Sequence, residues 1–267
     1  VQITVEPGGA VAVLGNRGSF LLSDVAGIPS IVGTASAAGT AVSSVGAPIE
    51  IFSLYGYDIG PPVPLTAQIA DGIVASSLGG YQILFNGVPA PLLYVGANQI
   101  NCVIPGELKA DSAAIQIVTP QGTFQGPIMF LTGTQPEIFQ IGGHALAVNQ
   151  DGGLNSAEHA ASPGSVVSIW ATGLAAASGV GRPDGAIVSP EQVVPTAPVS
   201  ISFSALTTGQ SGTLQVEYAG DAPGQVWGLS QLNIWMPGVI APGNTSIAIT
   251  AHVGSAVSDA VFIYVHP

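Results

Sequence analysis

The sequence predicts an all-β protein built from two tandem antiparallel β-sandwiches. Apolar and polar residues alternate with a period of two in many short runs, as in strands that bury one face. Turn-forming pairs such as Asn86-Gly87, Asp151-Gly152 and Pro242-Gly243 separate the runs. One set of motifs also occurs twice along the chain, which indicates two homologous units. The alternating runs are 49–55, 81–85, 114–118, 165–170, 199–203, 214–218, 246–250 and 261–265.

The internal repeat is visible in two pairs of motifs. A segment that begins at Pro48 is matched 115 residues later by one that begins at Pro163. Gln99-Ile-Asn101 is matched 132 residues later by Gln231-Leu-Asn233. The larger second offset predicts that the second unit carries extra residues in its middle loops. We expect the two motif pairs to occupy equivalent sheet positions.

The repeat defines the expected domains. We place the first sandwich at 47–133, the second at 160–267, and a connecting segment with a hairpin at 134–159. Residues 1–46 match neither copy. They begin with an alternating run, Val1 to Val5, which predicts a strand. Their last part, 30–46, consists of small residues, and we interpret it as a linker or a tightly packed extended segment.

The charge content excludes several classes of protein. Only 7% of the 267 residues are charged, and the net charge is -12 with three basic residues. So few cations exclude a nucleic-acid partner. No apolar run approaches the roughly 20 residues of a spanning helix, so membrane insertion is not expected. A surface with few charges fits either a secreted acidic β-protein or one that is buried against other copies.

Cys102 is the single cysteine, so no disulfide can form within the chain. It lies in an apolar run without a basic neighbour in sequence, which favours a buried structural thiol over a nucleophile. Lysine is scarce, and the chain starts with Val1 rather than Met. Both features favour an extracellular protein whose signal peptide has been removed.

No catalytic motif is found, so we predict neither an enzyme nor a cofactor or metal site. The four histidines are scattered, and the Gly-x-Ser-x-Gly pattern of a nucleophile elbow is absent. The segment 149–155 places oxygen ligands at alternate positions, as in a calcium loop. It lacks the further carboxylates, so we interpret it as a hairpin turn. Asn244-Thr-Ser246 is a formal glycosylation acceptor on an expected loop.

The three tryptophans are the strongest candidates for contacts. Trp170 lies in an alternating strand and is expected in the core. Trp235 has the opposite parity to Ile234 and is expected to be exposed. Trp227 lies in a predicted loop. We assign Trp227 and Trp235 to a subunit interface, which we favour over a platform for stacking sugars.

The run Gly87-Val-Pro-Ala-Pro-Leu-Leu-Tyr-Val95, followed by Gln99-Ile-Asn101, carries a resemblance to a known family. The sequence resembles an uncharacterised tandem Ig-like C-terminal module of secreted acidobacterial proteins, over residues 47–267. Departures from its pattern include Cys102 at a position that is usually aromatic. The resemblance implies immunoglobulin-like sandwiches and export, and it implies no activity.

Two functions of different classes follow. The first is a secreted structural protein that self-assembles into an extracellular filament or sheath, with other copies of itself as partners. Its donor strand would be the N-terminal run, with Val1, Ile3 and Val5 entering a neighbouring subunit. Folding of this strand back onto its own unit is the competing possibility. The alternative function is a non-catalytic module that binds carbohydrate or the cell surface, with surface glycans as partners.

Overall fold

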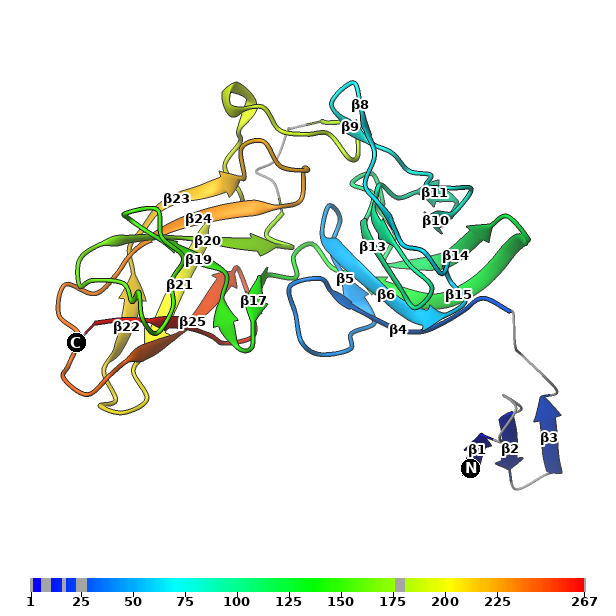
Figure 1. Ribbon diagram of the computed structural model, residues 1–267, viewed down its shortest axis with the longest axis horizontal. Helices are drawn as coiled ribbons and strands as arrows, with labels where there is room; N and C mark the ends of the chain where they lie inside the picture. The colour runs from blue at the N-terminus through cyan, green and yellow to red at the C-terminus, as the bar shows by residue number, and fades with distance from the viewer. Residues whose placement is uncertain (1, 6–10, 16–17, 23–27, 176–180, 267) are drawn as a thin grey trace.

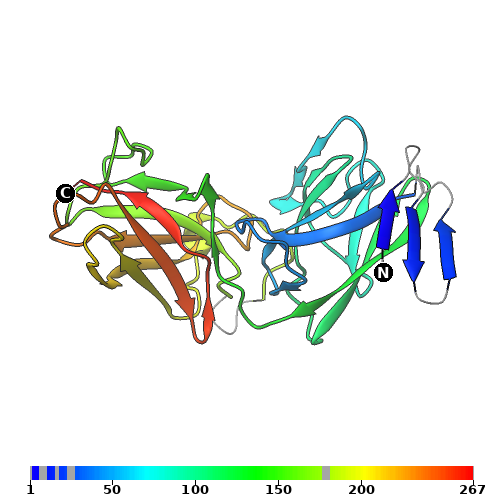
Figure 2. The same cartoon turned by 90° about the horizontal axis from the view of Figure 1, so that it is seen from below.

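The structure is a computed structural model that describes residues 2–5, 11–15, 18–22, 28–175 and 181–266. These residues form strands and turns together with one short 3₁₀ helix, η1 (Pro190–Gln192). The predicted all-β class is confirmed, because two β-sandwiches follow one another along the chain (Figure 1). The view turned by 90° shows the same two bodies (Figure 2). Within the described ranges, no helix is long and apolar enough to cross a membrane.

The first sandwich contains two five-stranded sheets. In hydrogen-bonding order, the first sheet is β4 (Ser30–Ser36), β6 (Ile51–Tyr57), β13 (Gln99–Val103), β12 (Leu92–Val95) and β7 (Leu65–Thr66). The second sheet is β11 (Val88–Pro89), β10 (Gln82–Phe85), β14 (Ser112–Thr119), β15 (Gly122–Leu131) and β5 (Val45–Gly46). All neighbours are antiparallel except β5, which runs parallel to β15. This distribution of strands is that of an immunoglobulin-like sandwich.

The second sandwich repeats this arrangement. Its first sheet is β16 (Glu137–Ile138), β20 (Val166–Thr172), β24 (Ser230–Trp235) and β23 (Val216–Asp221), with β19 (Ala147–Asn149) also paired to β20. Its second sheet is β17 (Gln140–Ile141), β18 (His144–Ala145), β27 (Val261–Tyr264), β25 (Ser246–Val253), β21 (Val199–Ser204) and β22 (Ser211–Leu214), with β26 (Ala256–Val257) on β25. Again one pair is parallel, β18 with β27.

The register of the sheets confirms the predicted repeat. In the first sandwich Asn101 of β13 lies opposite Ser53 of β6. In the second, Asn233 of β24 lies opposite Ser168 of β20. The two serines are 115 residues apart and the two asparagines 132, as the sequence offsets require. Each sandwich encloses its own core of buried apolar residues, which is the main source of its stability.

Residues 30–46 are not a linker, contrary to the first of our two interpretations. They contain β4, an edge strand paired with β6, and β5, which pairs with β15. At Gly46 the packing requires a residue without a side chain. A Cβ atom at Gly46 would come within 2.5 Å of the Met129 side chain. The first sandwich therefore begins near residue 30 rather than at 47.

Residues 134–159 are also more than a connection. They supply β16 and β19, which pair with β20, and the hairpin β17–β18 beside β27. Each strand has only two or three residues, too few for a period of two to be recognised in the sequence. The turn predicted at Asp151-Gly152 is present, with Gly152 at a φ of 87° and its N–H donating to the Asn149 carbonyl.

The N-terminal strands form a sheet of their own. β1 (Gln2–Val5), β2 (Val11–Gly15) and β3 (Gly18–Leu22) make an antiparallel meander. Ile3 lies opposite Val13, and Val5 opposite Val11. Within the described part of the chain, this sheet pairs with neither sandwich.

The two sandwiches are joined through side chains and backbone. Ile51 and Val103 of the first sandwich form a small buried cluster with Val226 of the second. The Thr172 hydroxyl accepts a hydrogen bond from the Ile51 N–H and donates one to the Gly228 carbonyl, both at 2.8 Å.

A two-stranded arm, β8 (Ile69–Ala70) and β9 (Ile73–Val74), adds to this attachment. It reaches the loop before η1 (Figure 1). There Val74 donates to the Gly185 carbonyl, and Ile187 donates to the Gly72 carbonyl. Val74 also belongs to the buried cluster of Ile51, Val103 and Val226, so the arm extends the contact between the two units.

Candidate functional site

Of the three predicted interface residues of the N-terminal strand, the structure describes two. Val1 lies outside the described residues. Ile3 and Val5 lie at alternate positions of β1, and β1 has a strand on one side only. No sandwich strand of the described chain pairs with β1, so the expected alternative of folding back onto its own sandwich finds no support in the pairing. Addition to a second copy stays a prediction.

The prediction for Trp227 is wrong. Its side chain is only 6% exposed, and a side chain added at Gly106 of the first sandwich would meet its ring at 3.4 Å. Trp227 therefore packs at the junction inside one chain and is not displayed to a second copy. The sequence placed it correctly in a loop but carried no signal that the other sandwich covers this loop.

The other two tryptophans also differ from each other. Trp235 is half-buried at the end of β24, and its Nε1 donates to the Glu217 carboxylate at 2.9 Å. Its interface role stays a prediction. Trp170, expected in the core, instead has the parity opposite to the buried Val167 and Ile169 of β20. It lies on the outer face of its sheet.

The longest unpaired edge belongs to β15. This strand has ten residues, but β5 pairs only with Phe130 and Leu131. Over 122–129, no other strand of the described chain pairs with its outer edge. β15 contains no charged residue, whereas charged side chains are a common protection of exposed edges. Pro127 is its one edge-blocking residue, because it lacks a backbone N–H.

Two exposed apolar side chains belong to this strand. Ile128 and Phe130 of β15 are 63% and 58% exposed. We call the outer edge of β15 together with these two side chains the open edge. Large side chains gathered beside unpaired backbone are typical of an interaction surface.

A groove of about 690 Å³ separates the two sandwiches. Its lining is mostly apolar and contains no ionisable side chain. Trp170 and Phe139 supply aromatic rings, and Asn101 and Gln225 supply amides. The remaining lining residues are Ala37, Ile51, Leu93, Leu146, Val148, Leu154, Val226 and Leu229. The groove suits a ligand without charge.

The Asn101 amide is held by a hydrogen-bonded cluster of serine, glutamine and asparagine, and the second sandwich contains an equivalent cluster. The Asn101 carbonyl oxygen accepts hydrogen bonds from the Ser53 hydroxyl at 3.1 Å and the Gln99 amide at 2.8 Å. This arrangement leaves the Asn101 Nδ2 group as a donor. Ser168 and Gln231 hold Asn233 in the same way, at 2.9 Å each. Only the first copy of the cluster lines the groove.

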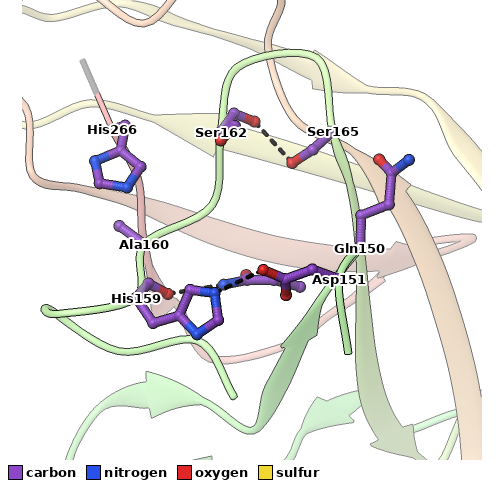
Figure 3. A pocket seen from close by; sticks show the side chains of 8 residues that line it. Gln150, Asp151, His159, Ala160, Ser162, Ser165 and His266 are labelled. Carbon is purple, nitrogen blue, oxygen red and sulfur yellow. Dashed lines mark hydrogen bonds and ion pairs between the residues drawn. The ribbon is translucent and has the colours of Figure 1, made fainter. Parts of the chain in front are cut away.

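A polar pocket of about 590 Å³ lies in the second sandwich (Figure 3). His159 Nε2 and Asp151 Oδ2 are 2.8 Å apart in it, and both side chains are exposed. The Gly153 N–H, and then His159, lower the pKa of Asp151. Ser165 donates to the Ser162 carbonyl, so neither serine of the pocket is bonded to His159. The pocket contains no activated nucleophile of the serine–histidine kind.

The oxygen atoms of the 149–155 turn are used by the chain itself. Asp151 Oδ1 accepts from the Gly153 N–H, and Asn149 Oδ1 accepts from the Asn155 amide. Of the residues that the structure describes, no three His, Cys, Asp or Glu side chains lie where they could hold a metal ion together. The turn is therefore explained by hydrogen bonds of the backbone and the amides.

The structure also shows the surroundings of Cys102 and Asn244. Cys102 is completely buried in the first core, as predicted, and burial raises the pKa of its thiol. Such a thiol behaves as a small apolar side chain. Asn244, the formal glycosylation acceptor, is 1% exposed, and its Nδ2 donates to the Ala241 carbonyl and the Thr208 hydroxyl. A glycan has no access to this side chain in the folded protein.

Comparison with known proteins gives little further guidance. No protein-family model matches the chain, and no curated protein matches it. Two solved structures of the plexin A4 full extracellular region, one of domains 1 to 8 and one of domains 1 to 10, cover 88% and 90% of this chain. Both are 14% identical to it, with a TM-score of 0.28. The chain spans 18% and 16% of their lengths. This likeness is too weak to carry an argument about function, and the resemblance to the acidobacterial module stays a prediction.

Proposed function

We propose that this protein is an extracellular structural protein whose copies assemble into a filament or sheath. The observation that carries the proposal is the open edge of β15. A long edge strand without charges is a template for a further strand from another chain. The N-terminal run of a second copy is the proposed occupant, by strand addition of the donor-strand type.

The exposed side chains at the open edge favour a donor strand with apolar side chains. The exposed side chains of Ile128 and Phe130 would be covered by a strand that brings Val1, Ile3 and Val5. Burial of each such side chain contributes about 1.5–3 kcal/mol, and the new backbone hydrogen bonds add to this. Pro127 interrupts the row of N–H donors, so a donor pairs on either side of it, which restricts the possible registers.

The charge distribution supports close association of copies. The net charge is -12, but only 7% of the residues are charged. β1 and β15 contain no charged residue. Repulsion between copies is therefore weak at these strands at ordinary ionic strength. The scarcity of lysine and the two tandem sandwiches suit a protein that works outside the cell, and we include this location in the proposal.

Deletion of residues 1–7 tests the proposed function. The truncated protein should keep its far-UV circular dichroism and lose its fibres in negative-stain microscopy. Undiminished fibre formation would contradict the proposal, and global unfolding would favour pairing within the chain. A matched pair of variants sharpens the result. I3K/V5K should abolish fibres, whereas Q2K/T4K, on the opposite face of the same strand, should weaken them less.

A second function is favoured by the groove, namely binding of an uncharged glycan. Trp170 offers a ring face, Asn101 and Gln225 offer amides, and no ionisable side chain lines the groove. Aromatic faces pack against sugar rings, and amides bond hydroxyl groups. The Asn101 Nδ2 group is a free donor because its partners Ser53 and Gln99 both bond the carbonyl oxygen.

Affinity electrophoresis through gels that contain dextran, xylan, mannan or hydroxyethyl cellulose tests this second function. At least one neutral polysaccharide should retard the protein. N101A and W170A should abolish the retardation. N233A should not, because it removes the equivalent amide outside the groove. Migration that none of the four polysaccharides changes, or equal effects of N101A and N233A, would rule out glycan binding at the groove.

A further inference from the structure

Two buried carboxyl groups lie at the junction of the sandwiches. Glu50 directly precedes β6 of the first sandwich, and Glu137 is the first residue of β16 in the second. The residues beside them make the junction bond, since the Ile51 N–H donates to the Thr172 hydroxyl and Thr172 lies opposite Glu137 in the sheet. Glu50 and Glu137 are therefore next to the same inter-sandwich contact, one from each side.

The surroundings of Glu50 do not compensate a negative charge. The Glu50 side chain is fully buried. Its carboxyl group lies beside Gly46, next to the apolar side chains of Met129 and Ile104. One carboxyl oxygen accepts a hydrogen bond from the Ala47 N–H at 2.8 Å. The other has no partner that meets hydrogen-bond geometry among the described residues, although the Ser36 hydroxyl is near.

The charged groups that face the two side chains are all acidic. Glu50 faces Glu137, and Glu137 faces Glu50 and Asp259. The Glu137 carboxyl group also accepts a hydrogen bond from the Asp259 N–H at 3.2 Å. No lysine, arginine or histidine of the described chain forms an ion pair with Glu50 or Glu137. An unpaired carboxylate in such a place is unfavourable, so the neutral form is preferred.

We propose that the junction is a proton-controlled joint, closed while Glu50 and Glu137 are neutral and loosened when both become carboxylates. Ionisation places two like charges on opposite sides of the contact between the sandwiches, and separation of the sandwiches increases the distance between these charges. The loosening separates the sandwiches without unfolding either one, because each keeps its own core. The joint does not involve β1, and its test reads the relative position of the sandwiches separately from fibre formation.

The pH range follows from the carboxyl groups themselves. Burial raises the pKa of Glu50 to about 8. Burial, and then the charge of Asp259, raise the pKa of Glu137 to about 7. A carboxyl group with a raised pKa contributes full stability below its unfolded pKa and loses it as the pH rises through the folded pKa. The joint should therefore be closed at pH 6 and open above pH 8.

Small-angle scattering and tryptophan emission between pH 5.5 and 9.5 test the joint. The radius of gyration should increase between pH 7 and 8.5 while the far-UV circular dichroism stays constant. In a W170F/W235F background, emission from Trp227 at the junction should shift to longer wavelength over the same range. E50Q should abolish or strongly reduce both changes, and E137Q provides a second test if E50Q does not fold. The control E217Q, at an exposed site on β23, should behave like the parent protein.

Three results would overturn the joint. The first is a radius of gyration that is constant over the whole range. The second is an unchanged transition in E50Q or E137Q. The third is a loss of circular dichroism that coincides with the expansion, because this would mean unfolding of a sandwich. Fibre formation at pH 6 is measured in parallel, so failure of the joint and failure of the proposed assembly are seen separately.

Discussion

The two sandwiches have the same strand arrangement but protect their last strand differently. In the second sandwich, β18 pairs with β27, and the Gly143 carbonyl accepts a hydrogen bond from Phe262. A further parallel bridge joins Ala161 to Val265. In the first sandwich, only the last two residues of β15 have such a partner. β5 and β18 both have two residues, so the open edge results from the length of the final strand, which is ten residues in β15 and four in β27.

The difference between the two final edges would make the copies of an assembly join in one defined way. If both final edges were open, a donor strand could pair with either sandwich, and the copies would join in several ways. With the final edge of the second sandwich covered, the longer final edge of the first sandwich is the favoured acceptor. The following predictions break or sharpen this comparison, beginning with the largest expected effect.

Charges at the open edge should have the largest effect. I128K/F130K places two cations beside the outer edge of β15, and both positions are exposed, so folding is expected to be unaffected. Fibre mass measured by sedimentation should fall at least tenfold. The matched control L206K/V239K introduces two cations at exposed positions of the second sandwich. Equal losses in both variants would show that charge alone, and not the open edge, controls assembly.

Truncation of equivalent core residues should have the next largest effect. Leu54 and Ile169 lie at corresponding positions of β6 and β20 and are completely buried. L54A and I169A should each lower the free energy of unfolding by about 2–5 kcal/mol. Urea unfolding at pH 6 measures the two losses. If L54A left the first sandwich as stable as before, the assignment of equivalent cores would be wrong.

The repeated amide cluster should give a smaller difference. Ser53 is buried, whereas Ser168 is half-buried, although both donate to an asparagine oxygen. S53A should cost about 1 kcal/mol, and S168A should cost less, because water can replace the lost donor at the more exposed site. Thermal unfolding of both variants at pH 6 makes the comparison. A larger loss for S168A would contradict it.

The thiol should give the smallest effect. Cys102 occupies in β13 the position that Ile234 occupies in β24, and both are completely buried. Ellman's reagent should not react with the native protein and should react fully in urea. C102A should leave fibre formation unchanged. Rapid reaction in the native state would show that the thiol is accessible and not a core residue.

The fold was predictable where local chemistry decides it. Asn86 and Gly87 have φ values of 51° and 83°, which the Asn-Gly pair adopts readily in a tight hairpin. The repeat offsets gave the sheet positions of Ser53 and Asn101. Residues 30–46 were harder to assign, because small residues are compatible with a linker as well as with the strands β4 and β5.

The sites were predictable only in part. The short N-terminal strand could be recognised by its alternation, but the open edge depends on how far β5 extends along β15. Trp227 is buried by a sandwich that lies far from it in sequence. Glu50 and Glu137 carry no local signal of burial, since an isolated acid in a sequence resembles any surface acid. Each of these features depends on residues that lie far apart in the sequence.

The arm β8–β9 has a consequence for the geometry of a fibre. Two bodies joined by a single flexible chain can swivel, whereas two bodies joined over an extended contact keep one relative orientation. Here the Thr172 bond, the bonds of the arm to Gly185 and Ile187, and the buried cluster that includes Val74 form one extended contact. The angle between the two sandwiches is thus set inside each molecule before any copies meet. In a filament of such molecules, loss of the arm would change this angle within each subunit without removing the contacts between copies.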